Sequence, residues 1–113
     1  MTSTCRYPET ELILQEAFKE KDLFRALQVA AEGACRLLGL PKVYFARSIG
    51  RRLHHLTGFG QEIYLPPLKV NIGHGYYAFL EGSESLAKEK REALVRALQE
   101  IVEYFMKGEK RAL

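Results

Sequence analysis

The spacing of hydrophobic residues changes twice along the chain and divides it into three parts. Between residues 11 and 38, apolar side chains recur every three or four positions, which is the period of an α-helix. Between residues 42 and 81 they form short runs or alternate with polar residues, and glycines separate the runs, as is typical of β-strands. Helical spacing returns from residue 83 to 107. The pattern therefore predicts helices, a small sheet and one long closing helix.

The front segment contains residues that begin and end helices. Asp22 is expected to be an N-cap, because its carboxylate can accept the unpaired N–H groups of a first turn. Gly39 suits the left-handed end of a helix, and Pro41 prevents its continuation. Thr10 could cap an earlier helix. The pattern leaves open whether residues 10–38 form two helices or one kinked helix.

The middle segment predicts an antiparallel sheet of about five strands. Residues 43–46 and 76–80 are apolar on both faces, which is typical of central, covered strands. Residues 51–57 and 68–72 alternate, and a further strand is expected to begin at residues 62–65. The prolines at 66 and 67 cannot donate ladder hydrogen bonds, so they must lie at an edge, a bulge or a break. Turns are expected at residues 48–50, 58–60 and 73–75.

Length and composition indicate one α+β domain. Its 113 residues are 47% hydrophobic and 27% charged, as in globular proteins. We expect a flexible arm at residues 1–9, a single domain at 10–108 and a frayed tail at 109–113. The two cysteines, Cys5 and Cys35, lack metal-binding spacing, and no apolar signal or membrane segment is seen, so a reducing, cytoplasmic location is expected. Many Lys, Arg and Glu residues with one Asn favour a heat-adapted source.

The net charge of +3 is concentrated in the middle segment. Residues 40–82 contain five basic and two acidic residues, whereas the two helical ends balance. Such a field favours anionic partners, although basic groups also protect ordinary strand edges. The candidate ligand or anion contacts are the basic and aromatic strand residues Tyr44, Arg47, Arg51, Arg52, His54 and Lys69.

Aromatic residues interleaved with these cations could bind nucleic acid, since bases stack on rings while phosphates pair with cations. The charge excess is small for such a role, and strands also favour aromatics for packing. No metal site is expected, because the adjacent His54 and His55 point to opposite faces of a strand. No nucleophile–base or carboxylate pair has a spacing that indicates an enzyme, and Cys35 lies on the apolar side of a helix, where packing is its expected role.

The order of elements resembles the GAF family of sensory domains over residues of about 20 to 106. Residues 22–27 are similar to the start of the first GAF helix. Residues 65–70 and 75–80 resemble the last two strands, and residues 85–105 resemble the closing helix. A Roadblock or longin-like sandwich is the alternative, but it places a helix between the second and third strands, where residues 58–62 leave no room.

The resemblance implies a small non-enzymatic signalling or regulatory module that binds a protein partner or a small ligand. GAF domains cover one sheet face with helices and loops after the second strand, and here that region shrinks to residues 58–61. The cysteines that attach tetrapyrroles or reduce methionine sulfoxide in this family are absent, so no cofactor is expected. The family commonly pairs through its first and last helices. Because the last helix has an unusually broad apolar surface, we expect a homodimer seam near Leu94, Ala97, Ile101 and Phe105.

Overall fold

The computed structural model describes residues 7–61 and 65–111, with side chains to residue 107. Its elements follow the expected order of helices, sheet and closing helix. They are α1 (Pro8–Phe18), α2 (Leu23–Leu38), β1 (Lys42–Ile49), β2 (Arg52–Gly60), β3 (Pro67–Gly73), β4 (Tyr76–Glu81), a short 3₁₀ turn (Ser83–Ser85) and α3 (Lys88–Arg111). The prediction of an α+β fold with helices before and after an antiparallel sheet is confirmed.

The front segment forms two helices, and their boundaries have local causes. Asp22 is the N-cap of α2, because its Oδ1 accepts a hydrogen bond of 2.9 Å from the N–H of Arg25. Gly39 ends α2 in the left-handed conformation, at a φ of +76°. The prediction for Thr10 was wrong: α1 already begins at Pro8, and the Thr10 hydroxyl donates to the Tyr7 carbonyl. The predicted arm therefore ends earlier than residue 9, and its residues 1–6 lie outside the described part.

The sheet has four strands, not five, in the order β2–β1–β4–β3 with every neighbouring pair antiparallel. The two apolar runs form the central strands β1 and β4, as expected. β3 is an edge strand that begins at Pro67, where a missing N–H costs no ladder bond. Leu65 and Pro66 precede it without strand structure, and the rest of the expected strand at 62–65 lies outside the described residues.

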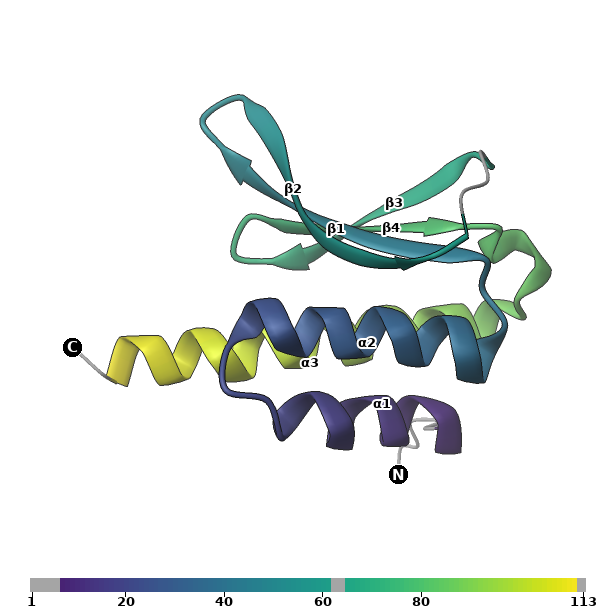
Figure 1. Ribbon diagram of the computed structural model, residues 1–113, viewed down its shortest axis with the longest axis horizontal. Helices are drawn as coiled ribbons and strands as arrows, with labels where there is room; N and C mark the ends of the chain where they lie inside the picture. The colour runs from purple at the N-terminus through teal and green to yellow at the C-terminus, as the bar shows by residue number, and fades with distance from the viewer. Residues whose placement is uncertain (1–6, 62–64, 112–113) are drawn as a thin grey trace.

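The helices form two layers against one face of the sheet. Figure 1 shows α2 and α3 side by side beneath the strands, with α1 on their far side. Alternate residues of the central strands, including Val43, Phe45 and Leu80, point toward these helices and are completely buried. We call this the inner face of the sheet and the opposite one the outer face. The chain therefore builds one core between the inner face and the helices.

The predicted dimer seam lies inside this core. Leu94, Ala97 and Ile101 of α3 are at most 2% exposed within a single chain, and Phe105 is half-buried against the same cluster. The broad apolar stripe of α3 has three neighbours within the chain, since this helix contacts β3, α1 and α2. Leu94, Ala97 and Ile101 are therefore covered by their own chain, and Phe105 packs partly against the same core.

A β-bulge changes the orientation of side chains along β2. Phe45 is opposite Thr57 while Ala46 is opposite His55, so Leu56 is an extra residue on the β2 side. Simple alternation predicted that His55 and Thr57 point the same way. Instead Thr57 is buried on the inner face and His55 is exposed on the outer face. Because the bulge adds one residue to β2, it determines which face of the sheet each residue between Leu56 and the β1–β2 turn occupies.

The expected turn at residues 58–60 is instead the end of β2. Gly58 is opposite Tyr44 on the outer face, and a Cβ at this position would lie 2.5 Å from the Tyr44 Cβ. A Cβ at Gly60 would lie equally close to the Lys42 Cα. Both glycines thus serve the close approach of strands rather than a reversal of the chain.

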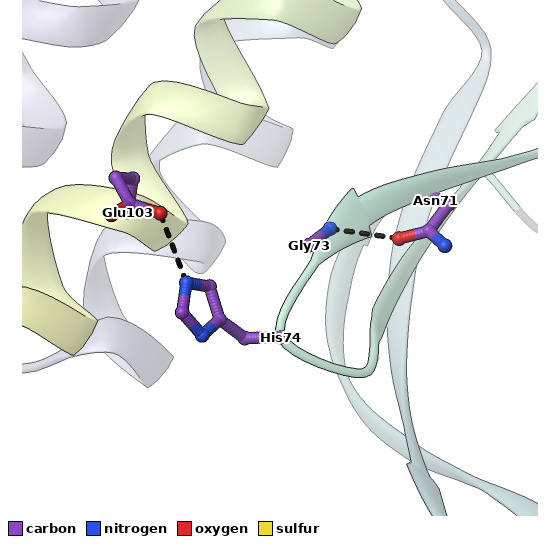
Figure 2. A network of polar contacts seen from close by, with 4 residues as sticks. All are labelled: Asn71, Gly73, His74 and Glu103. Carbon is purple, nitrogen blue, oxygen red and sulfur yellow. Dashed lines mark hydrogen bonds and ion pairs between the residues drawn. The ribbon is translucent and has the colours of Figure 1, made fainter.

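The turn between β3 and β4 is tied to α3. Gly73, His74 and Gly75 all have positive φ values, and the Asn71 side chain accepts a hydrogen bond of 2.8 Å from the Gly73 N–H. Figure 2 shows the His74 ring pointing from this turn toward Glu103 of α3, at 2.9 Å. The side-chain amide of Gln99 on α3 also donates to the Asn71 carbonyl. These contacts attach one end of the sheet to the closing helix.

Candidate functional site

The six predicted contact residues divide into two groups. Tyr44 and Lys69 lie on the outer face, on β1 and β3. The other four gather on the hairpin formed by β1 and β2. We call these four, Arg47, Arg51, Arg52 and His54, the cationic hairpin cluster.

The hairpin extends beyond the rest of the sheet. β4 pairs with β1 only as far as Arg47, which is opposite Tyr76, so residues 48–53 continue as a two-stranded ribbon. In Figure 1 this ribbon rises away from the helices at the end labelled β2. Its base is held by the Ser48 N–H, which donates to the Gly75 carbonyl at 2.7 Å. Gly50, at a φ of +64°, makes the turn.

Strand pairing places two arginines near one another on this ribbon. Arg47 is directly opposite His54, and Arg52, which is opposite Ile49, is the diagonal neighbour of Arg47 on the same face. β1 and β2 contain no Asp or Glu, and none of the three arginines forms an ion pair among the described residues. Like charges in neighbouring positions of a sheet repel one another. An anion bound across this face would therefore relieve repulsion that the isolated chain retains.

The ribbon also exposes apolar side chains that sequence reasoning missed as part of a site. Ile49 is 52% exposed and Leu53 is 42% exposed. Their pairing partners, Arg52 and Ser48, show that Ile49 lies on the inner side of the ribbon and Leu53 on the outer side. From the sequence, Ile49 was expected in a turn and Leu53 in a strand. Their positions beside the arginines along the chain were the signal that could have assigned them to the site.

The outer face carries a group of aromatic rings whose faces are already occupied. The rings of Tyr44 and Phe79 stack at 4.9 Å with 5° between their planes. The Lys42 Nζ lies 5.4 Å from the centre of the Tyr44 ring, and the Lys69 Nζ lies 4.7 Å from that of Tyr77. A base that stacked here would have to displace these partners. The arrangement argues against the expected stacking platform for single-stranded nucleic acid.

Tyr44 sits in an electrostatic setting that favours its neutral form. Partial burial raises the pKa of its hydroxyl, and the nearby Glu81 carboxylate raises it further. Glu81 is itself buried, and its Oε1 accepts a hydrogen bond of 3.4 Å from the Leu65 N–H. The tyrosine is therefore neutral here, and its ring packs against Phe79.

Cys35 does not have the setting of a nucleophile. Burial raises the pKa of its half-buried thiol, and a backbone hydrogen bond at Val43 opposes this shift only in part. Its Sγ lies 3.4 Å from the Phe59 carbonyl, to which the thiol donates. The packing role expected from its position is consistent with this environment.

The histidines do not converge. His54 and His55 lie on opposite faces of β2, as expected, and His74 is on a different turn. Among the side chains described, those of residues 7–61 and 65–107, no three His, Cys, Asp or Glu are grouped closely enough to hold a metal ion. The described residues thus give a metal no ligand set.

Two hollows lie on the helical part of the surface. One, of about 360 Å³, separates α1 from α2 and is lined by Leu12, Val29 and Leu37 together with the carboxylates of Glu16 and Glu32. The other, of about 330 Å³, lies between α3 and β3. Neither of these two hollows includes a residue of the cationic hairpin cluster, and all four residues of that cluster are exposed.

Comparison with known proteins gives no relative for this chain: no protein-family model, curated protein or solved structure matches it. The fold and the surface together define an α+β domain with a projecting cationic hairpin. No helix in the described part of the chain is both long and apolar enough to cross a membrane. The GAF-like assignment stays a prediction from the sequence pattern.

Proposed function

We propose that this chain is a small, non-enzymatic GAF-like regulatory module that binds an anionic partner or a small anionic ligand through the cationic hairpin cluster. The observation that carries the proposal is the placement of Arg47, Arg52 and His54 on one face of a projecting ribbon that lacks any carboxylate. Arg47 and Arg52 repel one another across this face, and a bound anion would relieve that repulsion, which supports an anion-binding role.

The short connection between β2 and β3 supports recognition at a surface. In the GAF family, the segment that follows the second strand covers one face of the sheet and forms the ligand pocket. Here β2 ends at Gly60 and β3 begins at Pro67, so only residues 61–66 connect two opposite edges of the sheet. A segment of that length cannot enclose most of a small molecule. We therefore expect binding on an open surface.

The non-enzymatic part of the proposal rests on the chemistry of the groups present. The thiol of Cys35 has a raised pKa, and a nucleophilic cysteine needs a lowered one. The arginines of the hairpin can hold an anion but cannot exchange protons near neutral pH. The cluster is thus suited to binding and electrostatic recognition.

Pairing of two copies is part of the same proposal, in a location different from the predicted seam. The groove between α1 and α2 exposes Leu12 and Leu37, at 43% and 41%. Apolar surface of this kind gains free energy when it is covered. We expect a homodimer to cover these residues, and native mass spectrometry of the wild-type chain and of Leu12→Glu tests this. A monomer for both proteins would contradict the pairing.

Binding of inorganic tripolyphosphate, followed by amide chemical shifts, tests the proposed anion site. We expect the largest shifts at residues 47–54 of the hairpin. The double variant Arg47→Gln/Arg52→Gln should lose most of the affinity, and Lys69→Gln, which removes a cation from the outer face, should keep it. Shifts that are absent, or that survive the double substitution, would contradict the proposed function.

A further inference from the structure

We infer that the anionic partner of the cationic hairpin cluster is the phosphate backbone of double-stranded nucleic acid, which the ribbon enters tip first. This inference rests on the proposed function and adds the class of partner to it. The surface concerned is the ribbon at residues 47–54, with Ile49 and Leu53 beside the charges.

The dimensions of the ribbon match a groove of duplex DNA. The major groove is about 12 Å wide and about 8.5 Å deep, and it admits a two-stranded β-ribbon. The part of the ribbon beyond Ser48, whose N–H is bonded to the Gly75 carbonyl, is residues 49–52, and the two residues on each strand span about 7 Å at about 3.3 Å per residue. The tip can therefore enter the groove, which is deeper than the projecting part is long, while the sheet stays outside.

The distribution of charge on the ribbon fits two walls of phosphates. Three of the four residues of the cluster are arginines, whose planar guanidinium groups bind phosphate oxygens in pairs. Arg47 and Arg52 lie on different strands of the ribbon, and Arg51 lies at its turn. The guanidinium of Arg47 is also placed over the Tyr76 ring at 5.6 Å, which holds it at the base of the ribbon. Cations thus line the ribbon from its base to its tip.

The exposed apolar residues favour a groove over a lipid surface. Ile49 and Leu53 lie on opposite sides of the ribbon, so no single apolar side could enter a bilayer while the arginines contact headgroups. In a groove, apolar side chains on both sides can contact sugars and thymine methyl groups. Single-stranded nucleic acid is disfavoured because the rings of the outer face are already covered.

The test measures the affinity of the whole protein for a fluorescein-labelled DNA duplex of mixed sequence by anisotropy, over a series of salt concentrations. Neutralising three phosphates predicts a slope of log K against log salt of about −2.7, from about 0.9 for each phosphate. Arg51→Gln and Arg52→Gln should each reduce the magnitude of this slope by about 1. Lys88→Gln, on the first residue of α3, is the matched control for the loss of one positive charge, and it should leave the slope unchanged.

The possible results separate this inference from the proposed function. A slope that is insensitive to both arginine substitutions, or that the control changes equally, overturns the inference. Tighter binding to a single-stranded oligonucleotide of the same sequence, or to anionic phospholipid vesicles, than to the duplex also overturns it. If tripolyphosphate or a polyglutamate peptide binds through the hairpin while the duplex does not, the proposed anion site stands and the nucleic-acid partner is rejected. Circular dichroism of each variant confirms that it is folded.

Discussion

The imidazole Nε2 of His74 lies 2.9 Å from the Glu103 Oε1, which joins the β3–β4 turn to the closing helix across 29 positions of sequence (Figure 2). His74 makes this contact from a backbone φ of +55°, the one positive value at a non-glycine position in the described residues. Left-handed backbone is unfavourable for side chains with a Cβ and worst for β-branched ones. The position therefore combines a favourable contact with a conformational cost.

Substitutions at His74 separate these two effects. His74→Asn loses the contact but tolerates the left-handed conformation, so it should lower the free energy of unfolding by less than about 1 kcal/mol. His74→Val adds a β-branched residue at positive φ and should cost about 1–2 kcal/mol more. Urea unfolding of the two variants measures the difference. Equal stabilities for Asn and Val would show that the backbone conformation imposes no cost here.

Substitutions on α3 test whether its apolar stripe belongs to the core. Ile101 is completely buried, so Ile101→Ala should lower the free energy of unfolding by about 2–5 kcal/mol. Leu68→Ala removes the same class of side chain from an exposed position on β3 and should change stability by about 0.5 kcal/mol or less. Denaturant unfolding compares them. If Ile101→Ala were harmless to folding but changed the oligomeric mass, the original assignment of this residue to a dimer seam would be right.

The glycines that close the end of β2 should resist substitution. Gly58→Ala brings a Cβ within 2.5 Å of the Tyr44 Cβ and 2.8 Å of the Val43 carbonyl oxygen, so the two strands must separate. We expect a loss of more than about 2 kcal/mol in thermal or chemical unfolding, as for other overpacked sites. Gly50→Ala is the matched control, because no atom lies within 4 Å of the added Cβ and only the positive φ opposes it. A smaller loss at Gly58 than at Gly50 would contradict the close approach of β1 and β2.

The raised pKa of Tyr44 predicts a specific alkaline instability. A group whose pKa is higher in the folded chain stabilises the fold below its unfolded pKa, and this stabilisation is lost as the pH rises through the folded value. Stability should therefore fall above about pH 10, the ordinary value for tyrosine. Tyr44→Phe should reduce that fall, as measured by unfolding at neutral and alkaline pH. Because the Glu81 charge contributes to the shift, Glu81→Gln should lower the pKa of Tyr44 in a spectrophotometric titration.

The sequence predicted the ends of helices and strands well wherever a single residue determines where the element begins or ends. Asp22 and Gly39 were identified from the sequence as the residues that begin and end α2, and both act by the expected mechanism. The prolines at 66 and 67 were expected at an edge, a bulge or a break, and Pro67 begins the edge strand β3. In each case the effect is local: a side-chain carboxylate, a missing Cβ or a missing N–H acts on the residues next to it in the chain.

Features that depend on a partner strand or helix could not be predicted in the same way. The bulge at Leu56 arises from its pairing with Phe45 and Ala46, and nothing in the alternation of β2 signals it. The Gly58 and Gly60 pair looked like a turn because glycine serves both turns and close strand contacts. The sequence shows that the apolar stripe on α3 is broad, but only the packing of α1 and α2 against α3 shows that the same chain covers this stripe.

The candidate site was predicted in part. Four of the six residues meet on the hairpin because β1 and β2 are consecutive and antiparallel, which sequence alone indicated. Tyr44 and Lys69 were separated from them because strand alternation places these two residues on the other face of the sheet. The length of the projecting ribbon depends on where β4 stops pairing with β1, and that is a property of the whole sheet.

The cationic hairpin has a consequence for how the molecule approaches other molecules in solution. Apart from Arg47, Arg51 and Arg52, the chain carries 17 − 3 = 14 basic residues, equal to its 14 acidic ones. Its excess positive charge is thus concentrated at one extremity, and the molecule behaves as an electric dipole whose positive end is the ribbon. In the field of any polyanion such a dipole rotates before contact occurs. The ribbon would then lead each encounter, and dissolved salt, by screening that field, would slow productive encounters.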